Sequence, residues 1–161
     1  MLQGARPVGA TRRATSRRRA LAVGALGGLI AVLAPRLAMA KPEDVAAAIK
    51  KLYGDKAIAA GKVKLEMPQI AENGNVVPMT VTVESPMTDA DYVKAVHIFA
   101  EGNPLPAVAT FYFTAASGKA VASTRIRMAT TQNIVAVAET SKGELLTGKT
   151  EVKVTIGGCG G

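Results

Sequence analysis

The feature of this sequence that most limits its possible folds is a regular alternation of apolar and polar residues that begins after Gly61. The alternation covers residues 63–66, 77–83, 122–128 and 151–156. Successive side chains of a β-strand point to opposite faces of the sheet, so this two-residue period places one set in a core and the other in solvent. These four segments therefore predict half-buried β-strands.

Three further segments are less regular but rich in β-branched and aromatic residues, at 92–99, 108–113 and 133–138. Clusters of residues typical of turns separate the segments. About seven short strands divided in this way are typical of a two-sheet sandwich. We therefore predict a mainly β fold, an immunoglobulin-like antiparallel β-sandwich over residues 41–156. The Cys…Trp…Cys core of antibody domains is missing, because the chain has one cysteine and no tryptophan.

A short helix is predicted before the first strand, from Pro42 to about Leu52. Proline followed by two acidic residues suits a first helical turn, where N–H groups are free and the helix dipole is positive. Apolar residues then recur at helical spacing from Val45 to Leu52, and Gly54 provides an end signal.

Residues 1–40 have the composition of a cleaved export signal. A basic stretch precedes an apolar run of 15 residues at positions 20–34. This run is shorter than the ~20 residues that a membrane-spanning helix needs. Ala-Met-Ala at 38–40 forms a small-x-small cleavage site, which predicts Lys41 as the first residue of a mature protein with no membrane attachment.

Within this leader, the segment SRRRAL at 16–21 resembles the twin-arginine motif, which directs folded proteins to a bacterial export channel. Ordinary secretion is the alternative route. Both routes lead out of the cytoplasm, and we expect the periplasm.

The leader also accounts for the basic character of the chain, whose formal net charge is +8. It contains seven of the 20 basic residues and no acidic residue, which leaves 13 basic and 12 acidic residues in the predicted mature part. A nearly neutral domain gives no indication of nucleic-acid binding. The one local basic pair, Arg125 and Arg127, is interpreted as a solvated strand edge.

The only cysteine, Cys159, lies in a glycine-rich segment beyond the last predicted strand. Glycine has no side chain to bury and loses much entropy on ordering, so we predict a flexible arm over residues 157–161. The residues that provide this flexibility are Gly157, Gly158, Gly160 and Gly161. Fully extended, the three steps from Ile156 to Cys159 span roughly 10 Å. A single cysteine in an exported protein indicates a reactive thiol or an intermolecular disulfide.

The predicted sandwich itself contains no clear catalytic or metal-binding pattern. His97 is the only histidine and lies within a strand, where a lone histidine is normally a packing or hydrogen-bonding residue. Asp89 and Asp91 have no third acid at the spacing of a calcium loop and are interpreted as turn residues. The prediction is a non-catalytic body without metal or cofactor.

Residues 93–113 are apolar on both faces of their predicted strands. One interpretation is a central pair of strands covered on both sides within the same chain. The other is that one face packs against a partner subunit.

These features together resemble the SoxY family, the sulfur-carrier subunits of bacterial thiosulfate-oxidising (Sox) systems. The resemblance rests on the GGCGG segment after a valine-rich strand, the arginine-rich leader, and a central block at residues 84–94 and 97–101. Asn103-Pro104 and the aromatic triplet at 111–113 extend it over essentially the whole predicted mature chain.

The resemblance implies a sandwich that pairs with a second, SoxZ-like sandwich subunit. It also implies that a haem-containing enzyme conjugates thiosulfate to Cys159. A hydrolase would then release sulfate, and a dehydrogenase would oxidise the remaining sulfane sulfur. In this scheme Cys159 holds covalent adducts, the glycines let the arm enter each enzyme, and the carrier has no turnover of its own.

Two alternatives remain open from the sequence. A plain exported immunoglobulin-like binding module could use Cys159 for an intermolecular disulfide. A Gly-Gly terminus also occurs in ubiquitin-like carriers that bear sulfur as a thiocarboxylate on the last glycine, but those are cytosolic and have a small mixed α/β fold.

Overall fold

The structure is a computed structural model that describes residues 39–158. The described residues belong to one compact unit. The predicted leader, apart from its last two residues, and Cys159, Gly160 and Gly161 lie outside the described residues.

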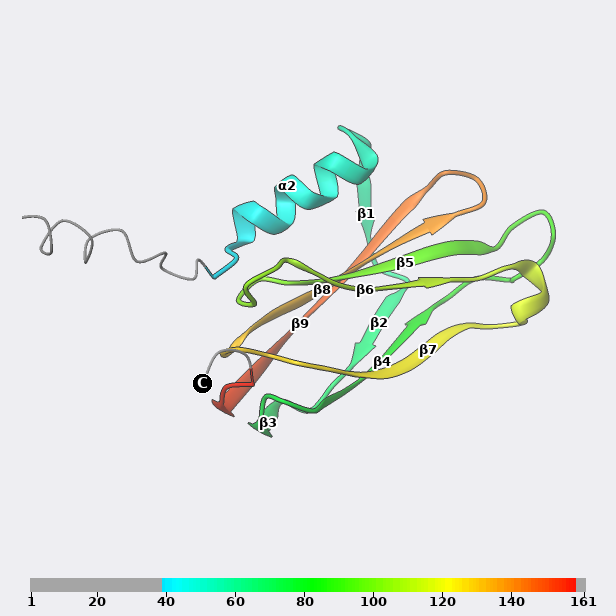
Figure 1. Cartoon of the computed structure of the whole chain (residues 1–161). Coiled ribbons are helices and arrows are strands. Elements are labelled where there is room, and N and C mark those ends of the chain that lie inside the picture. The colour runs from blue at the N-terminus through cyan, green and yellow to red at the C-terminus, as the bar shows by residue number, and fades with distance from the viewer. Residues whose placement is uncertain (1–38, 159–161) are drawn as a thin grey trace, which may run out of the picture. The chain divides into compact units, whose positions relative to one another are not determined.

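One α-helix, nine strands and one short 3-10 helix make up the described part of the chain (Figure 1). The helix α2 spans Pro42–Tyr53, and the 3-10 helix η2 spans Ala115–Ser117. The strands are β1 (Ile58–Ala60), β2 (Val63–Glu66), β3 (Ile70–Asn73), β4 (Val77–Val83), β5 (Val93–Ala100), β6 (Ala107–Tyr112), β7 (Ala120–Ile126), β8 (Gln132–Thr140) and β9 (Leu145–Ile156).

The strands form two sheets that pack face to face, which confirms the predicted mainly β, immunoglobulin-like sandwich with a short N-terminal helix. The larger sheet has the order β1-β9-β8-β5-β6, and β3 also pairs with β9; the smaller sheet has the order β2-β4-β7. All pairs are antiparallel except β1 with β9 and β3 with β9, which are parallel. The two parallel pairs involve β1 and β3, which were not predicted because they are too short to show a periodicity.

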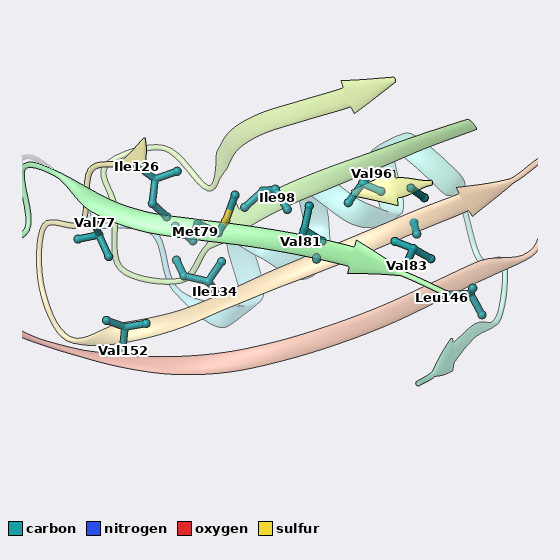
Figure 2. Close-up of a cluster of buried hydrophobic side chains, with 14 of the residues drawn as sticks. Val77, Met79, Val81, Val83, Val96, Ile98, Ile126, Ile134, Leu146 and Val152 are labelled. Carbon is teal, nitrogen blue, oxygen red and sulfur yellow. The ribbon is translucent and has the colours of Figure 1, made fainter. Parts of the chain in front are cut away.

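The core lies between the two sheets and contains the alternating residues of β4. Val77, Met79, Val81 and Val83 are buried, while the residues between them are exposed or half-buried. Figure 2 shows these side chains beside Val96, Ile98, Ile134 and Val152, which belong to β5, β8 and β9. Full burial of each such side chain contributes about 1.5–3 kcal/mol to folding.

Helix α2 covers the outer face of the larger sheet. Its N-terminus is capped because the backbone N–H of Lys41 donates to Asp44 Oδ2 at 2.8 Å. The buried Val45 packs against Phe99 of β5 and against Val135 and Val137 of β8. Strand β5 is therefore covered on both faces by its own chain.

This arrangement decides between the two interpretations of the apolar segment 93–113. For β5 the interpretation of a strand covered on both sides by the same chain is confirmed, because α2 packs on the face that a partner subunit would otherwise cover. Strand β6 differs, because it lies at the edge of the larger sheet and is largely exposed. Tyr112 in β6 is 79% exposed. Uncovered apolar surface in this segment is thus confined to the β6 edge and the loop before it.

A glycine in β9 allows the two sheets to approach closely, and this leads to a stability prediction. A methyl group at Gly148 would collide with the backbone carbonyl of Val63 in β2. Backbone cannot rotate away as a side chain can, so we expect Gly148→Ala to lower the free energy of unfolding by about 1–3 kcal/mol. Urea denaturation measures this change. As a control, the exposed Thr155→Ala in the same strand should shift stability by less than ~0.5 kcal/mol. Equal stability of the two variants would contradict the close approach of β2 and β9.

Candidate functional site

The site suggested by the sequence begins where β9 ends, and three segments meet there. After Ile156 the chain continues through Gly157 and Gly158 beside the turn between β3 and β4 and the loop between β7 and β8. Gly74 N–H donates to the Ile156 carbonyl at 2.7 Å, and Met128 N–H donates to the Gly74 carbonyl at 2.7 Å. Gly158 N–H then donates to the Met128 carbonyl at 2.8 Å. The ends of β9 and β7 and the strand β3 lie at the same end of the sandwich (Figure 1).

The glycines at this junction leave no room for side chains. A Cβ atom at Gly158 would collide with the backbone of Gly74 and Asn75, and one at Gly157 with the carbonyl of Ala129. The contacts are therefore made by backbone alone. We call the backbone surface of residues 74–75 and 128–129 that holds Gly157 and Gly158 the seat.

The seat changes how part of the glycine-rich arm is understood. Gly157 and Gly158 are hydrogen-bonded or tightly packed, so their lack of side chains has a packing reason. Cys159, Gly160 and Gly161 lie outside the described residues, and the flexibility of the arm as a whole stays a prediction. Gly74 is a residue that sequence reasoning missed, because its turn motif gave no sign that it contacts the C-terminal segment.

A buried polar network supports the loop that forms half of the seat. The Asn103 side chain accepts from Ala129 N–H at 3.0 Å and from Gln132 Nε2 at 2.8 Å, and it donates to the Arg127 carbonyl at 2.8 Å. Gln132 Oε1 accepts from Gly102 N–H at 2.6 Å. Buried polar groups that are all bonded hold a loop in one conformation. The network therefore fixes the position of residues 128–129.

Large apolar side chains are exposed beside the seat. Ile156, which precedes Gly157, is 65% exposed, and Val76, which follows the turn, is 58% exposed. Ile70 is also exposed, but it pairs with Lys153, three residues before Ile156, and therefore lies on the opposite face of the β3–β9 pair. Exposed aliphatic residues beside the seat are of the kind found in contacts with other proteins.

The other candidates from the sequence contribute no catalytic centre. His97 packs edge-on to Tyr53, with 5.7 Å between ring centroids, and its Nδ1 lies 3.1 Å from Thr110 Oγ1. Burial lowers the pKa of His97. The expected packing and hydrogen-bonding role is confirmed. Asp91 forms hydrogen bonds with Thr88 across a turn, as predicted for turn chemistry.

The described residues contain neither a metal-binding cluster nor a membrane-spanning helix. Between residues 39 and 158, no group of three or more histidine, cysteine, aspartate or glutamate side chains could hold a metal ion. No helix in this part of the chain has the length and hydropathy to cross a membrane. Arg125 and Arg127 are exposed on β7 and just after it, and neither forms an ion pair with another described residue.

Comparisons with known proteins point to one family. The sequence profile of the family described as "Sulfur oxidation protein SoxY" matches residues 49–159. The structure is similar to that of the sulfur carrier protein SoxY from Chlorobium limicola f thiosulfatophilum, with 35% sequence identity and a TM-score of 0.60. That similarity covers 71% of this chain and 98% of the other. No curated protein sequence matches significantly.

More distant structures share the fold alone. A superoxide reductase (neelaredoxin) from Ignicoccus hospitalis has a TM-score of 0.53 and 16% identity, over 72% of this chain and 94% of the other. The superoxide reductase from Nanoarchaeum equitans has a TM-score of 0.51 and 14% identity, over 60% of this chain and all of the other.

Proposed function

The chain belongs to the SoxY family of sulfur carrier proteins, and from this premise we propose that Cys159 holds the sulfur intermediates of thiosulfate oxidation covalently. The observation that carries the proposal is that the family match ends at residue 159, the only cysteine of the chain. The seat supports it as well, because it holds Gly158, the residue before Cys159, at a defined point on the sandwich.

The proposed chemistry places the thiol as an attachment point. Joining thiosulfate to it, Cys–SH + S–SO3(2−) → Cys–S–S–SO3(−) + H(+) + 2 electrons, is an oxidation and needs an electron acceptor. In our proposal, a haem-containing partner enzyme accepts these two electrons. Water then cleaves the S–SO3 bond on a hydrolase, which leaves Cys–S–SH and releases sulfate and a proton. A dehydrogenase then oxidises the remaining sulfane sulfur with water as the oxygen source, Cys–S–SH + 3 H2O → Cys–S–SO3(−) + 7 H(+) + 6 electrons, and passes the six electrons to an electron acceptor in our proposal.

The partners rather than the carrier activate the sulfur in this scheme. An unperturbed thiol has a pKa of about 8.5, so only a few per cent is thiolate at neutral pH. A weakly reactive thiol protects the carrier from adventitious reactions between enzymes. We propose that the protein itself has no turnover and uses no cofactor.

We further propose that the carrier works in the periplasm as a heterodimer with a SoxZ-like sandwich subunit. The leader composition at residues 1–40 supports export, and the arginine-rich segment 16–21 favours the twin-arginine route. Export of a folded protein by that route allows a partner without a leader to be carried along.

Intact-mass spectrometry of the purified protein tests the proposal. After incubation with thiosulfate and the loading enzyme, we expect adducts with thiosulfate or sulfur masses on a peptide that contains Cys159, all removed by a thiol reductant. A protein that yields only the reductant-sensitive mass of a dimer would support the intermolecular-disulfide alternative instead. Sulfur that resists reduction and lies on the last glycine would support the thiocarboxylate alternative.

A further inference from the structure

The bond at which the leader is predicted to be removed lies directly at the folded domain. It joins Ala40 to Lys41, and both residues belong to the described part of the chain. Helix α2 begins at Pro42, so no linker separates this bond from the helix (Figure 1). A protease must surround the segment that it cuts, which is why cleavage concentrates at exposed and poorly ordered parts of a chain. The surroundings of this bond therefore determine whether the leader can be removed from the folded protein.

The residue before the bond is held by the domain. Ala40 is 7% exposed, and its N–H donates to the Asn103 carbonyl at 2.8 Å. Asn103 is also buried, and its side chain belongs to the polar network that supports the seat, so the acceptor is fixed in place. Leader cleavage sites have small residues before the cut because these side chains fit pockets of the peptidase. The Ala40 side chain is buried in the structure and cannot enter such a pocket.

The amide of the bond itself is also hydrogen-bonded. Its nitrogen belongs to Lys41, and this N–H donates to Asp44 Oδ2 at 2.8 Å. A hydrogen bond to a charged carboxylate is stronger than one between neutral groups. The Lys41 carbonyl accepts from the N–H groups of Asp44 and Val45, at 2.9 and 3.2 Å. Both backbone groups of Lys41 are therefore engaged by the first turn of α2 and are not available to a protease.

The first turn of α2 is in turn anchored to the larger sheet. Val45 is buried and packs with Phe99, Val135 and Val137. Freeing Lys41 requires its hydrogen bonds to break while α2 stays docked, or the first turn to lift off the sheet. Both are local unfolding events of the kind that folded proteins undergo. When such opening is fast, the rate of cutting follows the fraction of molecules that are open.

We propose that the folded domain protects its own leader cleavage site, and that the leader is removed only when Ala40 and Lys41 detach from Asn103 and from the start of α2. In the open form, water adds across the Ala40–Lys41 amide and leaves a carboxylate on Ala40 and an ammonium group on Lys41. The inference rests on the proposed export leader and is independent of sulfur carrying.

The protection has different consequences for the two export routes. A chain that is secreted unfolded meets the peptidase before α2 has docked, so the bond is cut without delay. A chain that is exported folded, by the twin-arginine route, presents the protected bond, and cutting waits for local opening. The stability of the contacts around Ala40 and Lys41 then determines how long a folded precursor keeps its leader.

Cleavage of the purified full-length chain by a bacterial signal peptidase tests the proposal, with the products identified by mass spectrometry. The reference variant carries a short Gly-Ser linker inserted between Lys41 and Pro42. It keeps the residues on both sides of the bond and separates them from α2. We expect the linker variant to be cut between Ala40 and Lys41 at least tenfold faster than the unaltered chain, which corresponds to ~1.4 kcal/mol of opening free energy.

Two point variants test the contact at the scissile amide. Asp44→Ala removes the acceptor of the Lys41 N–H and should speed cleavage about fivefold. Glu43→Ala is the matched control, because Glu43 is an exposed acid in the same turn whose side chain forms no hydrogen bond or ion pair with another described residue. It should leave the rate unchanged. Amide exchange, measured without protease, should be slow at Ala40 and Lys41 in the unaltered chain and faster at Lys41 in Asp44→Ala.

Several outcomes would overturn the proposal. These are equal rates for the unaltered chain and the linker variant, a rate for Asp44→Ala no higher than that for Glu43→Ala, or amide exchange at Ala40 and Lys41 as fast as in an unfolded chain. A linker variant that is not cut, or is cut at another bond, would overturn the predicted leader cleavage site together with this inference. None of these readouts depends on Cys159, so sulfur carrying can fail while this inference stands.

Discussion

Replacing Cys159 with serine is expected to abolish thiosulfate-dependent electron flow in a reconstituted system and to leave the thermal midpoint unchanged. The chain has no second cysteine that could hold the sulfur, so the loss should be complete. Cys159 follows the last hydrogen-bonded residue of the described domain, and changes outside a packed core usually alter stability by less than ~0.5 kcal/mol. Electron transfer to an external acceptor and thermal unfolding measure the two effects.

Moving the thiol provides the control for this variant. Cys159→Ser combined with Thr155→Cys provides one cysteine at an exposed position of β9 in place of the cysteine at position 159, and it should stay inactive. A residual turnover of Cys159→Ser would show that sulfur is carried elsewhere. A loss of several kcal/mol of stability would show that Cys159 is packed.

Valine substitutions on the two sides of Cys159 are expected to have different effects. At Gly158 a valine side chain collides with the backbone of Gly74 and Asn75, so the residue must leave the seat. We expect loss of the hydrogen bond from Gly158 to Met128, faster amide exchange at both Gly158 and Gly74, and at least tenfold slower enzyme-driven loading. A tenfold slower rate corresponds to an activation free energy for loading that is ~1.4 kcal/mol higher, because the thiol is held in the wrong position in the partner enzyme.

Gly160→Val is the matched variant on the other side of the thiol. It adds the same β-branched bulk on the other side of Cys159. Slower loading with unchanged amide exchange at Gly158 and Gly74 would therefore be attributed to the width of the arm. Both variants should react with a small maleimide at the wild-type rate. Wild-type exchange and wild-type loading by Gly158→Val would show that the seat has no role in transfer. Normal loading of the Gly160→Val variant would show that the arm does not have to be narrow at residue 160.

The strands β4 and β7 of the smaller sheet could be predicted because each is buried on one regular face. The alternation in β4 and β7 follows directly from one face in the core and one in solvent. Helix α2 ends within one residue of its predicted limit, since proline and glycine mark its two ends. Local chemistry determines both features.

Features that depend on distant contacts were missed. β1 and β3 have three and four residues, and their pairing with β9 is what makes them strands. The first half of β9 has two adjacent buried leucines followed by Gly148, which breaks the alternation. Its extent therefore depends on neighbouring strands rather than on its own pattern.

The same limit applies to the glycines of the candidate site. Sequence shows that Gly157 and Gly158 can adopt many conformations, but it does not show whether that freedom is used for motion or for close packing. The contact with Gly74 joins segments far apart in the chain, and no local signal marks it. The proposed carrying residue, in contrast, could be named from the sequence, because there is only one cysteine.

The seat also bears on how a single carrier could serve enzymes with pockets of different depth. While Gly158 stays bonded to Met128, the Cα atom of residue 159 is one peptide step, about 3.8 Å, from the Cα atom of a residue held by the domain. Release of Gly157 and Gly158 adds two more steps, at the cost of breaking one backbone hydrogen bond, about 1 kcal/mol. An enzyme with a shallow pocket would then accept the arm while Gly158 is still bonded to Met128. An enzyme with a deep pocket would bind only the molecules in which Gly157 and Gly158 are released, a population several-fold smaller. Under the proposed function, the strength of one hydrogen bond would set the relative occupancy of successive enzymes by the same sulfur atom.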